Sequence, residues 1–264
     1  MSWTSSSIRA ALGLPARPGA DQSYVGVSTD TRSLPAGALF VAIAGERFDG
    51  HAHLEEAAAR GALGAVVRAG TPAVLGLELF EVPDTVEALG WLARARRREI
   101  GGPVVAVTGT NGKTSTKEML ALTLGTRFRV HATRANLNNL IGVPLTILEA
   151  PADTEALVIE AGASVPGEIA RYRQIVEPTV AVVTNVAAGH LEGFGSLEGV
   201  LREKLSLVEG APLAVVGTAL ASWPITSPAS RIRAWKSLLS QISPSSATRV
   251  SWASSEAVRL PESP

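Results

Sequence analysis

Residues 104–217 alternate short apolar runs with segments in which apolar residues recur at helical spacing. The apolar runs are VVAVTG, ALVIEAGA, VAVVTNV and LAVVG, and KTSTKEMLALTLGT, GEIARYRQIV and SLEGVLREKLSLVEG lie between them. Uniformly apolar strands that alternate with helices predict a parallel sheet covered by helices on both faces. In such sheets ligands bind at the carboxyl ends of the strands, so the pattern also predicts where a site lies.

The first hundred residues follow a different rhythm. A helix stops at Gly61 before a short apolar strand, and TVEALGWLARARRREI has helical spacing with a basic last turn. Two glycines and a proline at residues 101–103 then break the chain. We therefore predict an α/β protein, with a small N-terminal α/β domain over residues 1–100 and a parallel-sheet domain over residues 101–217.

Residues 218–264 do not continue the alternation. This segment is rich in serine and contains no glycine. We predict a poorly structured tail, in which RIRAWKSLLSQI is the stretch with the spacing of a short amphipathic helix.

The overall composition of the chain excludes some classes of binding partner and site. The chain carries 24 Lys and Arg against 24 Asp and Glu, and a neutral chain is not expected to bind nucleic acid or a membrane surface. It has no cysteine, which excludes disulfides, thiolate metal sites and thiol nucleophiles. No run reaches the ~18 apolar residues of a membrane helix, so we expect a cytoplasmic protein without a membrane span.

The turn in VVAVTGTNGKTSTKEML joins a buried strand to a helix. Backbone N–H groups at the start of the helix, together with its dipole, form a cradle for phosphate oxygens. Gly109 and Gly112 allow close approach of the backbone, Lys113 supplies a charge and Thr114 a hydroxyl for Mg²⁺. The match is to the short form G-x-x-G-K-[ST] of the phosphate-loop motif, and the alternative is an ordinary glycine-rich turn with an exposed lysine.

Several stretches in the same order resemble the Mur ligases, the ATP-dependent amide-forming enzymes of peptidoglycan precursor synthesis. They are VTGTNGKTSTKEM, NLNNLIGVPLTIL, VIEAGASVPGEIA, TNVAAGHLEGFGSLEGV and, nearer the N-terminus, STDTRSLPAGALFVAIAGERFDGH. The resemblance implies a UDP-MurNAc-peptide-binding domain followed by a P-loop ATPase domain. The NLNN and GEI segments favour the member that adds D-alanyl-D-alanine (D-Ala-D-Ala) to UDP-MurNAc-tripeptide. The related ligase that adds a diamino acid to UDP-MurNAc-dipeptide is the alternative.

The resemblance also implies site residues. ATP would be held by Gly109, Thr110, Asn111, Gly112, Lys113, Thr114, Ser115, Asn138 and Asn139. Two Mg²⁺ ions would be bound through Thr114, Glu160, His190 and Lys204, with Lys204 carbamylated by CO₂. The catalytic residues would be Lys113, His190 and Lys204.

The residues themselves leave alternatives open for several of these roles. Glu160 ends an apolar strand, where a carboxylate suits Mg²⁺ but can equally be solvated. Without the resemblance, His190 would be a structural histidine and Lys204 an exposed helix residue. Asn138 and Asn139 can bind ligand or cap turns.

In the N-terminal domain, Ser28, Asp30 and Arg32 are candidates for binding the uridine diphosphate, with Arg32 pairing a phosphate. The alternative is a structural ion pair between Asp30 and Arg32. This sequence also departs from the family at Ala135, where the family often has glycine before the first Asn of NLNN.

The family's third domain, which binds the incoming amine, is not recognisable in this sequence. We therefore expect a truncated ligase. Separately, we expect a monomer. Three readings stay open: a ligase that needs the missing domain from another chain, a non-catalytic nucleotide-binding module, and a non-functional fragment.

Overall fold

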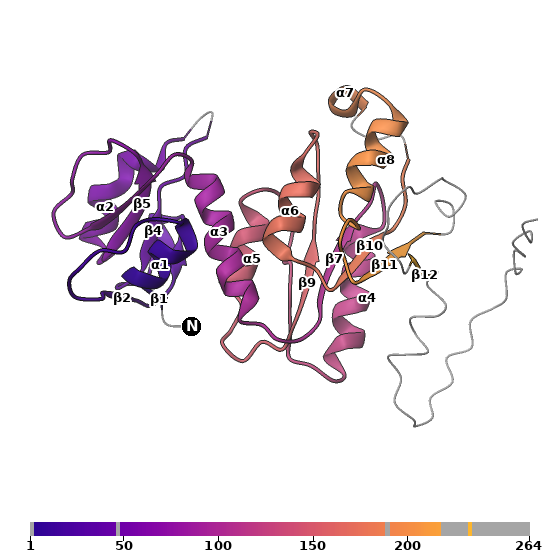
Figure 1. Cartoon of the computed structure of the whole chain (residues 1–264), viewed down its shortest axis with the longest axis horizontal. Coiled ribbons are helices and arrows are strands. Elements are labelled where there is room, and N and C mark those ends of the chain that lie inside the picture. The colour runs from indigo at the N-terminus through magenta and orange to yellow at the C-terminus, as the bar shows by residue number, and fades with distance from the viewer. Residues whose placement is uncertain (1–2, 46–47, 188–190, 218–231, 234–264) are drawn as a thin grey trace, which may run out of the picture.

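A computed structural model describes residues 3–45, 48–187, 191–217 and 232–233. They form two α/β units, each built on its own parallel sheet, with one long helix between them (Figure 1). This confirms the predicted α/β class.

The N-terminal unit is built on a four-stranded parallel sheet of order β3-β4-β5-β6, beside a two-residue antiparallel pair, β1 with β2. Side chains alternate between the faces of a strand, and in β4 Leu39 and Val41 pack on one side while Phe40 packs on the other. The elements are β1 Trp3–Thr4, α1 Ser5–Leu12, β2 Ser23–Tyr24, β3 Val27–Ser28, η1 Thr31–Ser33, β4 Leu39–Val41, η2 Gly50–His53, α2 Leu54–Ala59, β5 Gly64–Arg68 and β6 Glu78–Val82.

Helix α3, Thr85–Arg98, lies between the two units and contacts α1 on one side and α5 and α6 on the other (Figure 1). It begins where the Asp84 carboxylate accepts hydrogen bonds from the N–H groups of Val86 and Glu87. Gly90 lowers helix propensity, but a Cβ there would collide with the Ile175 side chain of α6. The glycine therefore permits the close approach of α3 to the second unit.

The second unit is a six-stranded parallel sheet of order β12-β11-β10-β7-β9-β8, as the alternation predicted. The alternation did not reveal β8, which is three residues long, or α5, which contains Pro144 in its first turn, where the missing N–H does no harm. The elements are β7 Val104–Thr108, α4 Lys113–Gly125, β8 Val130–Ala132, α5 Gly142–Leu148, β9 Ala156–Glu160, α6 Glu168–Val176, β10 Val180–Val183, α7 Leu191–Phe194, α8 Leu197–Leu205, β11 Leu213–Val216 and β12 Ile232–Arg233.

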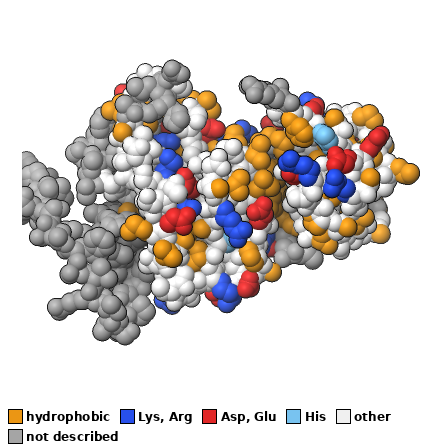
Figure 2. All heavy atoms as spheres, turned by 180° about the vertical axis from the view of Figure 1, so that it is seen from behind, with side chains coloured by type: hydrophobic (Ala, Val, Ile, Leu, Met, Phe, Trp, Pro, Cys, Tyr) orange, Lys and Arg blue, Asp and Glu red, His pale blue; other side chains and the backbone are white. Residues whose placement is uncertain are grey.

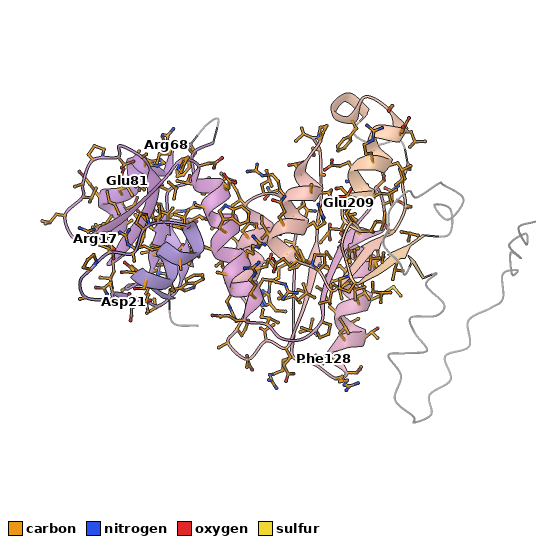
Figure 3. All side chains as sticks on the ribbon, in the orientation of Figure 1. Arg17, Asp21, Arg68, Glu81, Phe128 and Glu209 are labelled. Atoms are coloured by element: carbon orange, nitrogen blue, oxygen red, sulfur yellow. The ribbon has the colours of Figure 1, made fainter. Side chains whose placement is uncertain are left out.

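Helices cover both faces of this sheet. Helix α4 packs Leu120 and Leu124 against one face of β7, while α5, α6 and α8 pack against the other. Strand β7 is therefore central and fully buried, and its carboxyl end leads into the glycine-bearing loop. In Figure 3, Phe128, just beyond α4, lies at the opposite end of the sheet from that loop.

The helix suggested for RIRAWKSLLSQI is wrong at Ile232 and Arg233, which form β12 and pair in parallel with β11. The open edge of β11 offers unpaired backbone groups, and pairing with them outweighs the helical spacing of the side chains. The rest of the tail lies outside the described residues.

Acidic and basic side chains are interspersed on the face shown in Figure 2, in keeping with a neutral chain. Among the residues that the structure describes, no helix is long and apolar enough to cross a membrane.

Candidate functional site

The loop after β7 has a backbone that requires its glycines. Gly109 has φ 146° and Gly112 has φ 77°, backbone angles that residues with a side chain rarely adopt. A Cβ on Gly109 would also overlap the Thr184 hydroxyl. Helix α4 then begins at Lys113 without a side-chain cap, so its first N–H groups are available to an anion.

The segment after β10 braces this loop. The Thr110 N–H donates to the Asn185 carbonyl (3.1 Å), and the Asn111 N–H donates to Asn185 Oδ1 (2.9 Å). The Thr184 hydroxyl donates to the Asn111 carbonyl (2.7 Å). Thr184 and Asn185 were not among the predicted site residues, although both follow an apolar strand at its carboxyl end. Because the N–H groups of Thr110 and Asn111 are already bonded, the N–H groups in the first turn of α4 are the ones that an anion could reach.

A cleft of about 190 Å³ opens beside the loop. Its lining includes six of the predicted site residues, which come from three separate segments of the chain. The lining residues are Gly109, Thr110, Lys113, Asn138, Asn139, Gly162, Ala163, Ser164, Glu168, Phe194, Val200 and Lys204. The other four predicted ATP-binding residues, Asn111, Gly112, Thr114 and Ser115, are exposed at the loop and the start of α4 and do not line it.

Lys113 is half-buried in this cleft. Its Nζ donates to the carbonyls of Gly109 (2.9 Å) and Thr110 (3.1 Å). The ammonium is therefore held over the loop from which it arises, without an acidic partner among the ion pairs of the described residues. The Lys113 ammonium is therefore already positioned to pair with an anion bound at the loop.

Glu160, at the end of β9, is 2% exposed. Its Oε1 accepts a hydrogen bond from Asn138 Nδ2 (2.9 Å), and its Oε2 is buried without a hydrogen-bond partner. Leaving a buried acceptor unsatisfied is costly. An orphaned carboxylate oxygen of this kind fits a ligand of a hard cation such as Mg²⁺.

Asn139 lines the cleft. Its side chain also caps a turn, which was the alternative role predicted for it from the sequence. Its Oδ1 accepts from the N–H groups of Ile141 (3.1 Å) and Gly142 (2.8 Å) at the start of α5. Ala135, earlier in this loop, has φ 47°, which lies in the left-handed region. Glycine suits this position because it has no Cβ to clash in the left-handed conformation. Alanine at the same position therefore carries backbone strain.

Lys204 on α8 is 3% exposed and lies over the Phe194 ring, 5.8 Å from its centroid. Burial, reinforced by the charge of Lys113, lowers the pKa of its amine to about 8. Next to it, the buried Glu203 carboxylate accepts from the N–H groups of Gly167 and Ile169 (both 2.8 Å), which joins α8 to the start of α6. The exposed-helix alternative for Lys204 is therefore wrong.

The N-terminal candidates do not join this cleft. Arg32 and Asp30 form an ion pair in which Nη2 and Oδ2 are 2.7 Å apart, and the Ser28 hydroxyl donates to the Asp30 carbonyl (3.1 Å). Arg32 lowers the pKa of Asp30 to about 2. His190 lies outside the described residues, and within them no three His, Cys, Asp or Glu side chains cluster as a metal site.

Known proteins share the sequence and fold of this chain. The sequence pattern of the Mur ligase middle domain matches residues 107–233, and that of the Mur ligase family catalytic domain matches residues 23–97. This chain belongs to the Mur ligase family. The two patterns cover most of both units of the fold, including the loop, the residues that line the cleft and strand β9, which ends at Glu160.

Two relatives in this family carry the name UDP-N-acetylmuramoyl-tripeptide–D-alanyl-D-alanine ligase. The one from Bacillus subtilis (strain 168) is 42% identical over 209 residues, 75% of this chain and 44% of the relative. The one from Escherichia coli (strain K12) is 46% identical over 194 residues, 74% of this chain and 42% of the relative.

Two solved structures of the Mur ligase MurF share the fold. MurF from Acinetobacter baumannii matches with a TM-score of 0.74 and 34% identity, over 82% of this chain and 49% of that one. MurF from Thermotoga maritima in complex with ADP matches with a TM-score of 0.67 and 36% identity, over 72% and 45%. The chain thus spans about half the length of the Mur ligases it matches.

Proposed function

We propose that this chain is the nucleotide-binding part of an ATP-dependent carbon–nitrogen ligase that adds D-alanyl-D-alanine to UDP-MurNAc-tripeptide in peptidoglycan precursor synthesis. The observation that carries the proposal is the cleft, whose lining joins the Lys113 ammonium at an uncapped helix start to Asn138. Glu160 does not line the cleft itself, but its buried carboxylate accepts a hydrogen bond from the Asn138 amide. Two relatives of more than 40% identity bear the name of this ligase. The diamino-acid ligase is the less favoured alternative for that reason.

In this proposal the two units have separate tasks. Residues 1–100 would bind UDP-MurNAc-tripeptide, and residues 101–217 would bind ATP through the loop at Gly109–Ser115 and through Asn138 and Asn139. Asp30 uses Nε and Nη2 of Arg32, so the guanidinium could pair a diphosphate through its remaining N–H donors or by exchanging Asp30, and both side chains are exposed.

Mg²⁺ fits the residues that are present. The unpartnered Glu160 Oε2 is a hard oxygen donor, and Mg²⁺ usually takes one or two carboxylates and completes its shell with water and phosphate oxygens. Thr114, exposed on the first turn of α4, and His190 are the further proposed ligands. Bound Mg²⁺ would neutralise charge on the phosphates.

A second ion would need an anionic ligand, and we propose that carbamylated Lys204 supplies it. Carbamylation requires the neutral amine, which attacks CO₂ to form a carbamate and releases a proton. The burial of Lys204 and its lowered pKa, about 8, favour that neutral form.

The reaction would proceed in two balanced steps. An oxygen of the tripeptide's terminal carboxylate attacks the γ-phosphorus of ATP, the bond to the bridging oxygen breaks, and ADP leaves. The amine of D-alanyl-D-alanine then attacks the acyl carbon, the C–O bond to phosphate breaks, and the nitrogen loses a proton. Lys113 would hold the phosphates in line during the first step, a contribution made by position and charge.

Titration calorimetry of the full chain with ATP in excess Mg²⁺, and separately with UDP-MurNAc-tripeptide, tests the proposal. Lys113→Ala should weaken ATP binding by about 10-fold or more, since charge-assisted hydrogen bonds are the strong ones. Arg127→Ala, which removes an exposed cation beyond the other end of α4, is the matched control. Unchanged ATP binding by Lys113→Ala would refute the assigned role.

Product assays separate the remaining readings. Amide formation by this chain alone would support a complete ligase, and binding without turnover would support a nucleotide-binding module. No binding of either substrate would support a non-functional fragment. A monomer and a cytoplasmic location, where ATP and UDP-linked precursors meet, also stay proposals, and sedimentation and cell fractionation check them.

A further inference from the structure

Lys117 occupies a position where an apolar residue is expected. It lies one turn after Lys113, on the stripe of α4 that also carries Leu120 and Leu124 against the sheet. The residue is 2% exposed. Burying an ammonium is costly unless its protons find partners, so the partners of Lys117 indicate what it contributes.

The ammonium of Lys117 has two acceptors. Its Nζ donates to the buried Thr133 carbonyl at 2.8 Å and to Glu118 Oε1 at 2.6 Å. Glu118 is a neighbour on the helix with a 61% exposed side chain, so solvent can replace it. The Thr133 carbonyl lies at the end of β8, on a different element, and links α4 to the segment that precedes NLNN.

Thr133 in turn holds the end of β9. Its N–H donates to the Val158 carbonyl (3.0 Å), and its hydroxyl accepts the backbone N–H of Glu160 (2.9 Å). The segment that follows brings Asn138 back to Glu160, where its amide donates to Oε1, and its carbonyl accepts the Gly162 N–H (2.8 Å). Hydrogen bonds therefore run from Lys117 through Thr133 to the backbone of Glu160, and the segment that follows Thr133 carries the Asn138 amide that bonds the Glu160 carboxylate.

We propose that Lys117 is a positioning residue for the Mg²⁺–nucleotide site. Its buried ammonium fixes Thr133, and Thr133 fixes the backbone of Glu160, so that the carboxylate with the unpartnered Oε2 stays beside Asn138. The inference rests on the proposed function. It adds a second lysine on α4, which does not line the cleft and acts through its neighbours.

The first test compares ATP affinity in excess Mg²⁺ with ATP affinity in EDTA, by calorimetry on the full chain. Lys117→Met keeps the unbranched shape and most of the length of the side chain and removes the charge. It should weaken binding in Mg²⁺ by about 10-fold or more, as loss of an outer-shell partner does, and leave binding in EDTA unchanged. Glu118→Gln, which alters only the exposed partner, should behave like the unsubstituted chain.

The second test needs no ligand. The amide of Glu160 should exchange with solvent faster in Lys117→Met than in Glu118→Gln, because its acceptor, Thr133, is no longer fixed. If Lys117→Met does not fold, Thr133→Val and Thr133→Ser decide the question: the serine variant should keep the effect of Mg²⁺ on ATP binding, and the valine variant should lose it.

Equal weakening of ATP binding in Mg²⁺ and in EDTA, or unchanged Glu160 exchange, would assign Lys117 to fold stability alone and overturn the inference. An unsubstituted chain that binds ATP no better in Mg²⁺ than in EDTA would instead overturn the proposed function, and the inference with it.

Discussion

Glu177 links the second unit to α3 through two ion pairs, and Glu177→Gln is the perturbation that tests this link. The residue follows α6, and its carboxylate pairs with Arg94 (2.7 Å) and Arg98 (2.6 Å) on α3. Hydrogen bonding to Arg98, opposed by burial and helped by Arg94, lowers its pKa from 4.5 to about 2. The glutamine variant keeps the size of the side chain and removes the charge.

The size of the effect follows from that pKa. One pKa unit corresponds to about 1.4 kcal/mol. The lowered pKa of Glu177 therefore sets an upper limit of about 3 kcal/mol on what its ion pairs contribute to the unfolding free energy at neutral pH. Arg98 is 57% exposed and Glu177 30%, and solvent screening reduces the expected loss to about 1–2 kcal/mol. Because the folded chain holds its proton less tightly than the unfolded chain, this stability is present above pH 4.5 and is lost as the pH falls toward 2.

Urea unfolding followed by circular dichroism at several pH values measures this contribution. Glu177→Gln should lower the unfolding free energy at pH 7, and the difference from the unsubstituted chain should shrink as the solution is acidified. Glu198→Gln breaks an exposed pair with Arg202 on α8 and should cost less than about 0.5 kcal/mol. Equal losses in the two variants, or a loss from Glu177→Gln that does not change with pH, would refute the reasoning.

Two further changes should stabilise the chain. Ala135→Gly removes the strain of a left-handed alanine at φ 47°. It should raise the unfolding free energy by about 0.5–1 kcal/mol, once the larger conformational entropy that glycine gives the unfolded chain is subtracted. The control Ala121→Gly, inside α4, should lower the unfolding free energy by about 1 kcal/mol, and a destabilised Ala135→Gly variant would contradict the explanation. Lys204→Met removes a buried amine whose pKa falls from 10.5 to about 8. The unfolded chain holds that proton more tightly, so the variant should gain about 1–3 kcal/mol at pH 7, and this gain should shrink as the pH rises above 8 and be gone by pH 10.5. Thermal unfolding at pH values between 7 and 10.5 checks it, and a gain independent of pH would contradict it.

The sequence predicted the parts of the fold that repeat. Apolar runs such as VVAVTG and ALVIEAGA became adjacent strands β7 and β9, because buried parallel strands have a composition that few other elements share. The three-residue β8 and the proline-containing α5 were not predicted. Short elements bury too few residues to leave a periodic pattern, and contacts distant in sequence decide them.

The site was predictable where one local motif carries it. Gly109, Gly112 and Lys113 lie as the strand–turn–helix pattern indicates. The brace from Asn185 and the hydrogen bonds from Lys117 to Thr133 could not be foreseen, because each joins segments whose proximity depends on strand order. Lys204 shows the same limit, since its burial follows from the packing of α8 and not from its own helix.

Helix α3 belongs by sequence to the first unit, yet its side chains are shared. Leu89 and Leu92 pack in one core with Leu145 and Leu148 of α5, while Ala93 packs in the other core with Ile175 of α6. Cutting the chain at residue 100 would therefore strip apolar cover from whichever half lost the helix. In chimaeras between Mur ligases, α3, α5 and α6 should be transplanted together as a single cassette.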